Sequence, residues 1–291
     1  MFIAEMNYVT ILGCGFTGRE LARSLLDRRI GLTVTTRHPA RLKWIADAGG
    51  EVLELDLSEA QSLDHLRRAI RPETRVLHSI PSISTPAGAT DPTSGLLDAL
   101  EGRASRIVYL STTGVYGYAR EVDEHTLPAP RTERELLRAS AERAIAAASR
   151  SHLILRPAAI YGPGRGVQSA MRAGTFQLSG DGGKYVSRIH VEDLAALAEA
   201  ALFSGLTGAF PVADDEPCTS REIAEFCARL LNLPMPRGVP AEQLAETRRI
   251  APRADRRVDG SAIRRALGVE LRYPSYRTGI PASLAAESMG L

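Results

Sequence analysis

Short apolar, β-branched runs alternate with amphipathic stretches through the first half of the chain. Six of these runs have the length and composition of buried strands, at residues 8–13, 32–37, 51–55, 75–80, 106–111 and 152–156. Between them, residues 19–29 place Leu21, Leu25 and Leu26 on one helical face, and residues 133–150 are Ala-rich and periodic. Strands that alternate with helices build a parallel sheet covered on both faces. We therefore predict an α/β fold with a doubly wound parallel sheet.

The pattern changes after Pro157. Gly- and Pro-rich loops at 160–166 and 179–183 are followed by helical patterns at 191–203, 220–231 and 260–267, with a short strand at 209–213. We predict a first domain at residues 1–158. A smaller C-terminal lobe at 159–291 follows, and we expect it to be interleaved with the core.

Composition and charge are those of an ordinary globular protein, with 44% hydrophobic and 24% charged residues. The net charge of +2 comes from 36 basic and 34 acidic residues spread along the chain, which predicts neither a nucleic-acid surface nor a membrane patch. Small molecules are the expected partners, and a homodimer is possible because dimers are the commonest symmetric assembly.

Three cysteines, Cys14, Cys218 and Cys227, lack the spacing of a metal site or a disulfide framework. Met1–Met6 lacks the features of a signal peptide, and no apolar run reaches the roughly 18 residues of a membrane span. These features favour a cytoplasmic protein without a structural metal.

The first strand ends in Gly13-Cys14-Gly15-Phe16-Thr17-Gly18 and runs directly into a helix, which is the context that a GxGxxG motif needs. Gly13 permits a tight turn, Gly15 lets the backbone approach a pyrophosphate, and Gly18 allows close helix packing. The N-terminus of the helix offers N–H groups to an anion. This segment predicts a Rossmann-type dinucleotide site, with Phe16 and Thr17 included in it.

The end of the second predicted strand favours NADP over NAD. An NAD site usually has an acidic residue there to bind the ribose 2′-OH, but this strand ends in Thr36-Arg37, with Arg41 one turn later. Guanidinium groups suit a 2′-phosphate because they offer paired donors. The alternative for both arginines is a solvated position.

Two further residues are assigned to the cofactor from their position alone. Asp56 follows the third strand and could line the adenine pocket, although it could equally be the N-cap of the next helix. Ser79 stands at the exit of the fourth strand, which lies along the cofactor in a doubly wound sheet.

Three more segments identify a resemblance. They are Leu110-Ser111-Thr112-Thr113-Gly114-Val115-Tyr116-Gly117, Arg156-Pro157-Ala158-Ala159-Ile160-Tyr161-Gly162-Pro163-Gly164 and Arg188-Ile189-His190-Val191-Glu192-Asp193-Leu194. With the glycine turn, they resemble the extended or atypical short-chain dehydrogenase/reductase superfamily, of the epimerase/dehydratase kind, in order and approximate spacing over most of residues 7–200. The resemblance implies an NAD(P)-binding Rossmann domain and a C-terminal substrate lobe.

The resemblance fails at the catalytic pair. In that superfamily a hydroxyl and a Tyr-x-x-x-Lys pair move a proton while the nicotinamide moves a hydride. The resemblance places the hydroxyl on Thr112, Arg134 where the Tyr would stand and Arg138 where the Lys would stand. No Tyr-x-x-x-Lys occurs in the chain. A guanidinium does not deprotonate in proteins, so Arg134 cannot move a proton, whereas Arg138 could still bind the nicotinamide ribose.

Other polar residues could supply the proton: Tyr116, Tyr118, Tyr161, Lys184, Tyr185 and His190. Tyr116 is the first choice, with packing beneath its loop as the alternative. For His190 the simpler interpretation is a hydrogen-bonded, partly buried residue. Arg165 and Lys184 either bind an anionic substrate or are solvated.

Two functions stay open at this stage. The first is an NADP-dependent oxidoreductase acting on a carbonyl or alcohol, with Thr112, Tyr116 and Arg138 as candidate catalytic residues. The second is a non-catalytic NADP-binding redox sensor or interaction protein, which the missing pair favours. We prefer the enzyme, because hydride transfer is the chemistry of the cofactor itself. An NAD-retaining epimerase is disfavoured by Arg37, and a sugar-nucleotide dehydratase by Thr113 and Gly114 where an acidic pair is usual.

Overall fold

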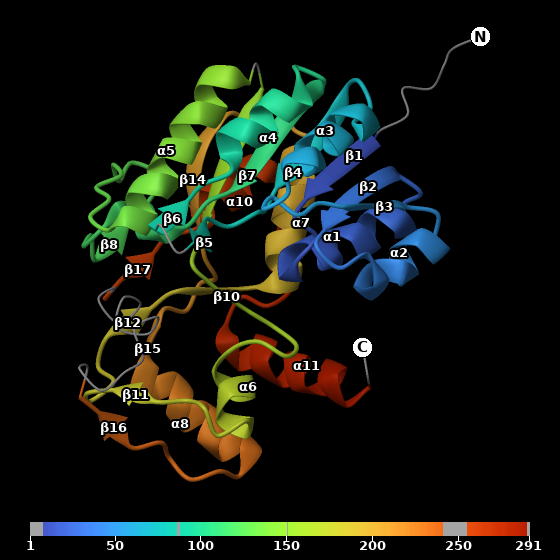
Figure 1. Cartoon of the computed structure of the whole chain (residues 1–291). Coiled ribbons are helices and arrows are strands. Elements are labelled where there is room, and N and C mark those ends of the chain that lie inside the picture. The colour runs from blue at the N-terminus through green and yellow to red at the C-terminus, as the bar shows by residue number, and fades with distance from the viewer. Residues whose placement is uncertain (1–7, 86–87, 150, 241–254, 290–291) are drawn as a thin grey trace. The chain divides into compact units, whose positions relative to one another are not determined.

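The structure is a computed structural model and describes residues 8–85, 88–149, 151–240 and 255–289 (Figure 1). The chain forms two compact units, each assembled from separate stretches of sequence. Unit 1 comprises Met1–Val115, Pro130–Arg156 and Ala195–Ala209, and unit 2 comprises Tyr116–Ala129, Pro157–Leu194 and Phe210–Leu291. Met1–Met6 and Arg150, where the sequence predicts the end of a helix, lie outside the described residues.

Most of a seven-stranded sheet belongs to unit 1, which includes only Gly208 and Ala209 of its edge strand. Its strands are β1 (Tyr8–Leu12), β2 (Gly31–Thr36), β3 (Glu51–Glu54), β4 (Thr74–His78), β7 (Ala104–Leu110), β9 (His152–Pro157) and β14 (Gly208–Val212). They are ordered β14-β9-β7-β4-β1-β2-β3, and the neighbours from β9 to β3 pair in parallel. This confirms the predicted α/β fold with a Rossmann-like, doubly wound sheet. The six predicted strands are all present, with ends displaced by at most two residues.

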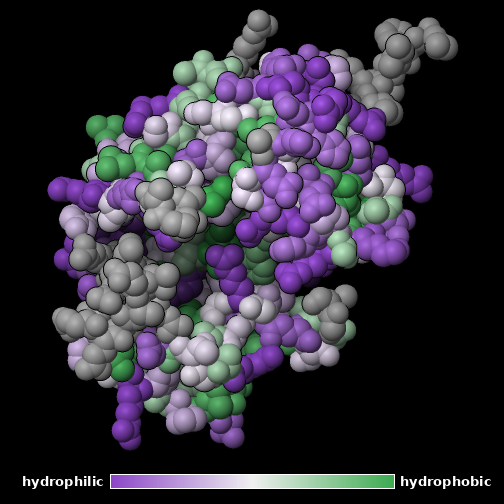
Figure 2. Space-filling model, viewed as in Figure 1, coloured by the Kyte–Doolittle hydropathy of each residue, from purple (hydrophilic) through white to green (hydrophobic). Residues whose placement is uncertain are grey.

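Three helices pack against one face of this sheet: α3 (Ala60–Ala69), α4 (Thr93–Leu100) and α5 (Glu133–Ala148). Each contributes apolar residues, among them Leu66, Leu96 and Ile145, to one buried cluster with the strands. The outer side of α3 exposes residues such as Asp64 and Arg68, and Figure 2 shows hydrophilic side chains over that helix. The polar and apolar positions of these helices are therefore separated as the sequence pattern predicts.

Two other helices of unit 1 are held together by one carboxylate. These are α1 (Phe16–Asp27) and α7 (Val191–Leu202), the second of which contributes its residues from Ala195 onwards. Ser24 Oγ donates to Glu199 at 2.5 Å, and Arg28 forms an ion pair with the same side chain. Glu199 thus joins two segments that are far apart in sequence, since it lies 171 residues after Arg28.

The remaining elements of unit 1 are short and surround the sheet. They are η1 (Pro39–Leu42), α2 (Lys43–Asp47), β5 (Ile83–Thr85), β6 (Gly88–Thr90) and most of η2 (Thr113–Tyr116). The strands β5 and β6 form an antiparallel pair after β4.

Unit 2 consists of short strands and helices around a core of its own. Its strands are β8 (Glu121–Val122), β10 (Ala159–Tyr161), β11 (Leu178–Ser179), β12 (Tyr185–Val186), β13 (Arg188–His190), β15 (Cys218–Thr219), β16 (Gly238–Val239) and β17 (Arg257–Val258), and its helices are α6 (Val167–Arg172), α8 (Ser220–Leu231), α10 (Ser261–Leu267) and α11 (Tyr276–Ser288). Buried residues of the core include Tyr161, Met171, Ile223 and Ile280. Within the described ranges, no helix is long and apolar enough to cross a membrane.

Candidate functional site

The strand order reverses between β1 and β4, and the polar ends of these strands meet at that point. Ser79 N donates to Leu12 O at 2.9 Å, which holds the exit of β4 beside the exit of β1. On the other side, Gly13 N donates to Thr35 Oγ1 at 2.9 Å and Cys14 N to Thr35 O at 2.8 Å. In open α/β sheets, ligands bind in the crevice outside the carboxyl ends of the strands at such a reversal.

The three glycines of the turn differ in what surrounds them. Gly13 has φ +84°, and a Cβ there would lie 2.7 Å from Ile80 Cγ1. A Cβ on Gly18 would lie 3.1 Å from Ile11 Cγ2, so this glycine allows α1 to pack closely on β1. A Cβ on Gly15 would have no neighbour within 4 Å. Two glycines are therefore required by the fold of the turn, whereas the backbone at Gly15 faces open space that a ligand could approach.

A cavity of about 620 Å³ opens at this point and lies wholly in unit 1; we call it the nucleotide cavity. Its lining residues are Gly13, Cys14, Gly15, Arg19, Thr35, Thr36, Arg37, His38, Arg41, Leu55, Asp56, Leu57, Ser58, Ser79, Ile80, Pro81, Ser82 and Ile83. Six of the residues predicted to bind the cofactor are among them. Phe16, Thr17 and Gly18 are not, and instead form the first turn of α1.

Sequence reasoning missed several lining residues, of which Arg19 carries a charge. Arg19 directly follows the last glycine of the motif, and this adjacency was the available signal. Ser82 and Ile83 were also missed, because they lie beyond the strand exit at His78–Pro81 that the sequence places along the cofactor.

The cavity is predominantly positive. Arg37 and Arg41 are exposed, and among the described residues no carboxylate pairs with either within 4.0 Å. Asp56 Oδ1 accepts hydrogen bonds from Ser58 N at 3.0 Å and Ser58 Oγ at 2.7 Å. These bonds, aided by the charges of Arg37 and His38, lower the pKa of Asp56, so it is ionised at neutral pH. The N-cap of α3 is Glu59, so Asp56 closes its own short turn rather than capping that helix.

The cavity fits a dinucleotide phosphate group. The N-cap of α1, Gly15, contributes no side-chain cap bond, and the first turn contains no acidic residue. Orphan N–H groups at a helix N-terminus bind anions, and the dipole favours negative charge there. An open glycine, unpaired guanidinium groups and this helix end are the features that a cofactor carrying phosphates would use.

The exit of β7 is held by a buried ion pair. Ser111 Oγ donates to Glu142 Oε1 at 2.5 Å, and Arg156 Nη2 donates to Glu142 Oε2 at 2.7 Å. All three residues are buried. The next residue, Thr112, is half-buried, and its Oγ1 accepts from Gly114 N at 3.1 Å. The pair therefore fixes the strand end from which Thr112 projects.

Arg138 lies against the wall of the nucleotide cavity. Its Nη1 donates to the hydroxyl of Tyr109 at 2.5 Å and to Ile80 O at 3.3 Å. Tyr109 is fully buried, and burial raises its pKa to about 12 despite the neighbouring guanidinium. Arg134, four residues earlier, is exposed. The guanidinium at the position of the superfamily's lysine thus contacts core groups on β7 and the loop after β4.

The proposed substitutes for the proton donor belong to unit 2. Tyr116 is 1% exposed, whereas Tyr118 is 54% exposed. Tyr161 is buried and its hydroxyl donates to Ser275 O at 3.4 Å. His190 is buried beside Ser283 Oγ at 3.1 Å, and burial lowers its pKa to about 4.

Three of the other loop residues are more accessible. Arg165 and Lys184 are exposed, and the ring of Tyr185 lies 3.5 Å from the guanidinium carbon of Arg257. Of the tyrosines proposed as donors, Tyr118 is thus the most accessible in its own unit.

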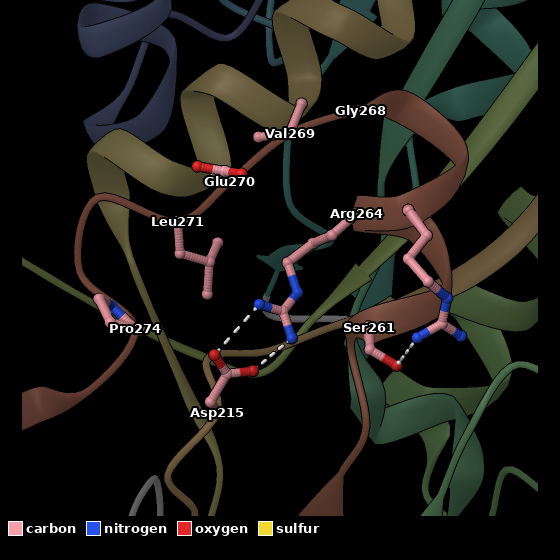
Figure 3. A pocket seen from close by; sticks show the side chains of 9 residues that line it. Asp215, Ser261, Arg264, Gly268, Val269, Glu270, Leu271 and Pro274 are labelled. Carbon is pink, nitrogen blue, oxygen red and sulfur yellow. Dashed lines mark hydrogen bonds and ion pairs between the residues drawn. The ribbon is translucent and has the colours of Figure 1, made fainter.

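Unit 2 has a second cavity, of about 500 Å³, lined by Asp215, Ser261, Arg264, Arg265, Gly268, Val269, Glu270, Leu271 and Pro274 (Figure 3). Both of its arginines have partners within the lining: Figure 3 shows Arg264 and Asp215 pointing toward each other, and Arg265 Nη1 donates to Ser261 Oγ at 2.7 Å. Because these groups satisfy each other, the nucleotide cavity is the better candidate site.

Comparison with known proteins identifies the family and the fold. Residues 9–208 match the sequence model described as the NAD dependent epimerase/dehydratase family. A 3-diazoavenalumate denitrifying reductase from a Streptomyces species is 33% identical over a 159-residue alignment that covers 49% of this chain and 50% of that protein. The chain therefore matches only half the length of this curated relative.

Two solved structures share the fold over nearly the whole chain. A conserved protein of unknown function from Silicibacter pomeroyi has a TM-score of 0.80 and 32% identity, covering 96% of this chain and 98% of that one. UDP-glucose 4-epimerase from Thermotoga maritima, solved with UDP-glucose, has a TM-score of 0.80 and 18% identity, covering 97% of this chain and 99% of that one. At that identity the epimerase shows the fold alone.

Proposed function

Because the chain belongs to the NAD-dependent epimerase/dehydratase family, we propose that it binds NADP in the nucleotide cavity and is an oxidoreductase acting on a small carbonyl or alcohol substrate. The observation that carries the choice of cofactor is the end of β2, where Arg37 and Arg41 line the cavity and no acidic residue follows the strand. A carboxylate there would bind a ribose 2′-OH and repel a 2′-phosphate. Guanidinium groups there would instead bind the 2′-phosphate.

The residues of the turn would hold the cofactor. Its pyrophosphate would be bound by the N-terminal turn of α1 next to Gly15, and its 2′-phosphate by Arg37 and Arg41. When bound, the nicotinamide supplies or accepts a hydride. Thr112, fixed by the Ser111–Glu142–Arg156 cluster, has a hydroxyl suited to orient a substrate oxygen.

Two findings support an oxidoreductase rather than an epimerase. The curated relative is described as a reductase, although the match covers half of its length. In addition, an epimerase returns its hydride to the same substrate and keeps its cofactor, whereas a site built for a 2′-phosphate suits a cofactor that is exchanged at each turnover. Reduction still requires a proton, and we propose that water supplies it.

A second function, a non-catalytic NADP-binding sensor, is favoured by one observation. Tyr116, the first choice of proton donor, is 1% exposed in its own unit. NADPH-dependent turnover of any member of a broad panel of carbonyl compounds would exclude this function.

Calorimetric titration with NADPH and NADH tests the proposal on the wild type, Arg37→Ala and Arg68→Ala. Arg68 is an exposed residue of α3 outside the cavity and serves as the control. A charge-assisted hydrogen bond contributes about 1.5 to 3 kcal/mol, so we expect Arg37→Ala to weaken NADPH binding by about 10- to 100-fold and NADH binding very little. The proposal is wrong if a folded wild-type protein binds neither nucleotide, or if it prefers NADH.

A further inference from the structure

Arg19 is a charged residue of the nucleotide cavity that the motif does not explain. It lies in the first turn of α1, where its backbone N donates to Gly15 O at 3.0 Å, and its side chain is half-buried. It lines the cavity together with Arg37 and Arg41, which come from the end of β2 and from η1. Three separate elements thus contribute one guanidinium each to one cavity, against the single carboxylate of Asp56.

The side chain of Arg19 lacks partners that its neighbours on the helix have. Its Nε is buried and makes no hydrogen bond, and among the described residues no carboxylate pairs with it. The next residue, Glu20, pairs instead with Arg23 at 2.5 Å. At the C-terminal end of the helix, Arg28 pairs with Glu199.

Leaving this group unpaired has an energetic cost. A guanidinium carries five N–H donors and stays protonated, so it cannot escape desolvation by losing its charge. A buried donor without a partner destabilises the folded protein. The nearby thiol of Cys14 gives no compensation, because burial raises its pKa to about 12 and keeps it neutral. The position is therefore unfavourable for the protein alone and becomes favourable when an anion enters the cavity.

We propose that Arg19 is a further ligand-binding residue, which donates hydrogen bonds to a phosphate group of the nucleotide bound in this cavity. This inference rests on the proposed function, since it requires a nucleotide in the nucleotide cavity. Arg19 adds a charged side-chain donor to the N–H groups of the helix end, and a guanidinium at that position favours ligands with several phosphate charges.

The test compares Arg19→Met with Arg23→Met. Methionine replaces the apolar stem of arginine and removes its charge and its donors. Arg23 is the matched control because it lies one turn later on α1, is half-exposed, pairs with Glu20 and does not line the cavity. Calorimetric dissociation constants for NADPH and NADH, and melting temperatures with and without nucleotide, are measured on wild type and both variants.

We expect Arg19→Met to weaken NADPH binding by about 10- to 100-fold, as for the loss of a hydrogen bond to a charged group, and Arg23→Met to leave it unchanged. Without nucleotide, Arg19→Met should melt at the wild-type temperature or above it, because a buried unpaired donor is removed. The increase in melting temperature that NADPH produces should be smaller in this variant.

Comparing the losses for NADPH and NADH shows whether Arg19 contacts the pyrophosphate or the 2′-phosphate. Equal losses for NADPH and NADH assign Arg19 to the pyrophosphate, and a loss confined to NADPH assigns it to the 2′-phosphate; both support the inference. If Arg19→Met folds and binds both nucleotides as Arg23→Met does, the inference is overturned while the proposed function stands. If the wild type binds neither nucleotide, the proposed function itself fails.

Discussion

Charged groups at two places along the same sheet differ in whether they have a partner of opposite charge. Beyond β1 and β2, the guanidinium groups of Arg19 and Arg37 line a cavity without a carboxylate partner among the described residues. Where β7 ends, Glu142 of α5 and Arg156 of β9 form a buried ion pair, and Glu142 also accepts a hydrogen bond from the hydroxyl of Ser111. Removal of one member of a buried ion pair strongly destabilises the folded protein. A charge without a partner in the protein can instead contribute to binding a ligand. In this protein, charged residues that are paired stabilise the fold, and charged residues without a partner are the candidates for binding a ligand.

The largest expected effect comes from breaking the buried pair. Glu142→Gln leaves Arg156 buried and without its counter-charge, and we expect a loss of about 3 to 5 kcal/mol in the free energy of unfolding. Urea unfolding measures it. Asp47→Asn is the control, because it breaks the Lys43–Asp47 pair, in which both side chains are exposed, and should change stability by less than about 1 kcal/mol. Similar losses in the two variants would remove the distinction drawn above.

Next in size is Gly13→Ala, which tests the turn that shapes the nucleotide cavity. Left-handed backbone costs an alanine about 1 to 2 kcal/mol, and the added Cβ would also lie 2.7 Å from Ile80 Cγ1. Gly49 also has a positive φ, +91°, but a Cβ there would meet nothing within 4 Å. We therefore expect Gly13→Ala to lose more stability than Gly49→Ala, and to lose NADPH binding in calorimetry, which Gly49→Ala retains. Equal effects would show that the contact with Ile80 is unimportant.

An unpartnered buried carboxyl outside the nucleotide cavity should destabilise the protein once the pH is high enough to ionise it. Asp214, in unit 2, is 2% exposed, and its carboxylate oxygens make no hydrogen bond among the described residues. Burial raises its pKa to about 8, against 3.8 ordinarily, so the folded state holds a proton that the unfolded state has lost. Stability contributed by this group is therefore present below pH 4 and is lost as the pH rises toward 8.

The corresponding experiment is Asp214→Asn, followed by thermal unfolding between pH 4 and pH 8. The variant should gain about 1 to 3 kcal/mol over the wild type at pH 8, and the gain should vanish near pH 4. Asp215→Asn is the control, since Asp215 is half-exposed and pairs with Arg264. A gain that does not depend on pH would contradict the assignment to this carboxyl.

The smallest expected effect is that of Tyr109→Phe. It removes one hydrogen bond to Arg138 and should cost about 1 kcal/mol, because the half-buried guanidinium can still bond water and Ile80 O. NADPH binding should weaken by less than tenfold, or about 1.4 kcal/mol, because Ile80 loses some support. Tyr8→Phe removes a buried bond to Thr33 Oγ1 elsewhere in the sheet and should leave NADPH binding unchanged. Loss of binding as large as that expected for Arg37→Ala would instead make Arg138 part of the binding site.

The sheet and the glycine turn were within reach of the sequence because both depend on local patterns. Apolar runs marked the strands to within two residues, and Gly13 stands where the turn needs a positive φ. The partners of individual charges depend on long-range packing and could not be predicted. Nothing near Glu142 in the sequence indicates that it pairs with Arg156 rather than with solvent. For the same reason Arg19, which looks like an ordinary helical arginine, was identified only from the cavity that it lines.

The bond between Ser24 and Glu199 has a consequence for how the protein is made. Unit 1 includes Ala195–Ala209, which a ribosome adds only after about two thirds of the chain has been synthesised. Until then α1 lacks the helix it is joined to, and the sheet lacks its last strand, β14. Because distant segments must find each other, folding of this unit should be slow and should finish late in translation. A fragment that ends before Ala195 would therefore lack part of unit 1.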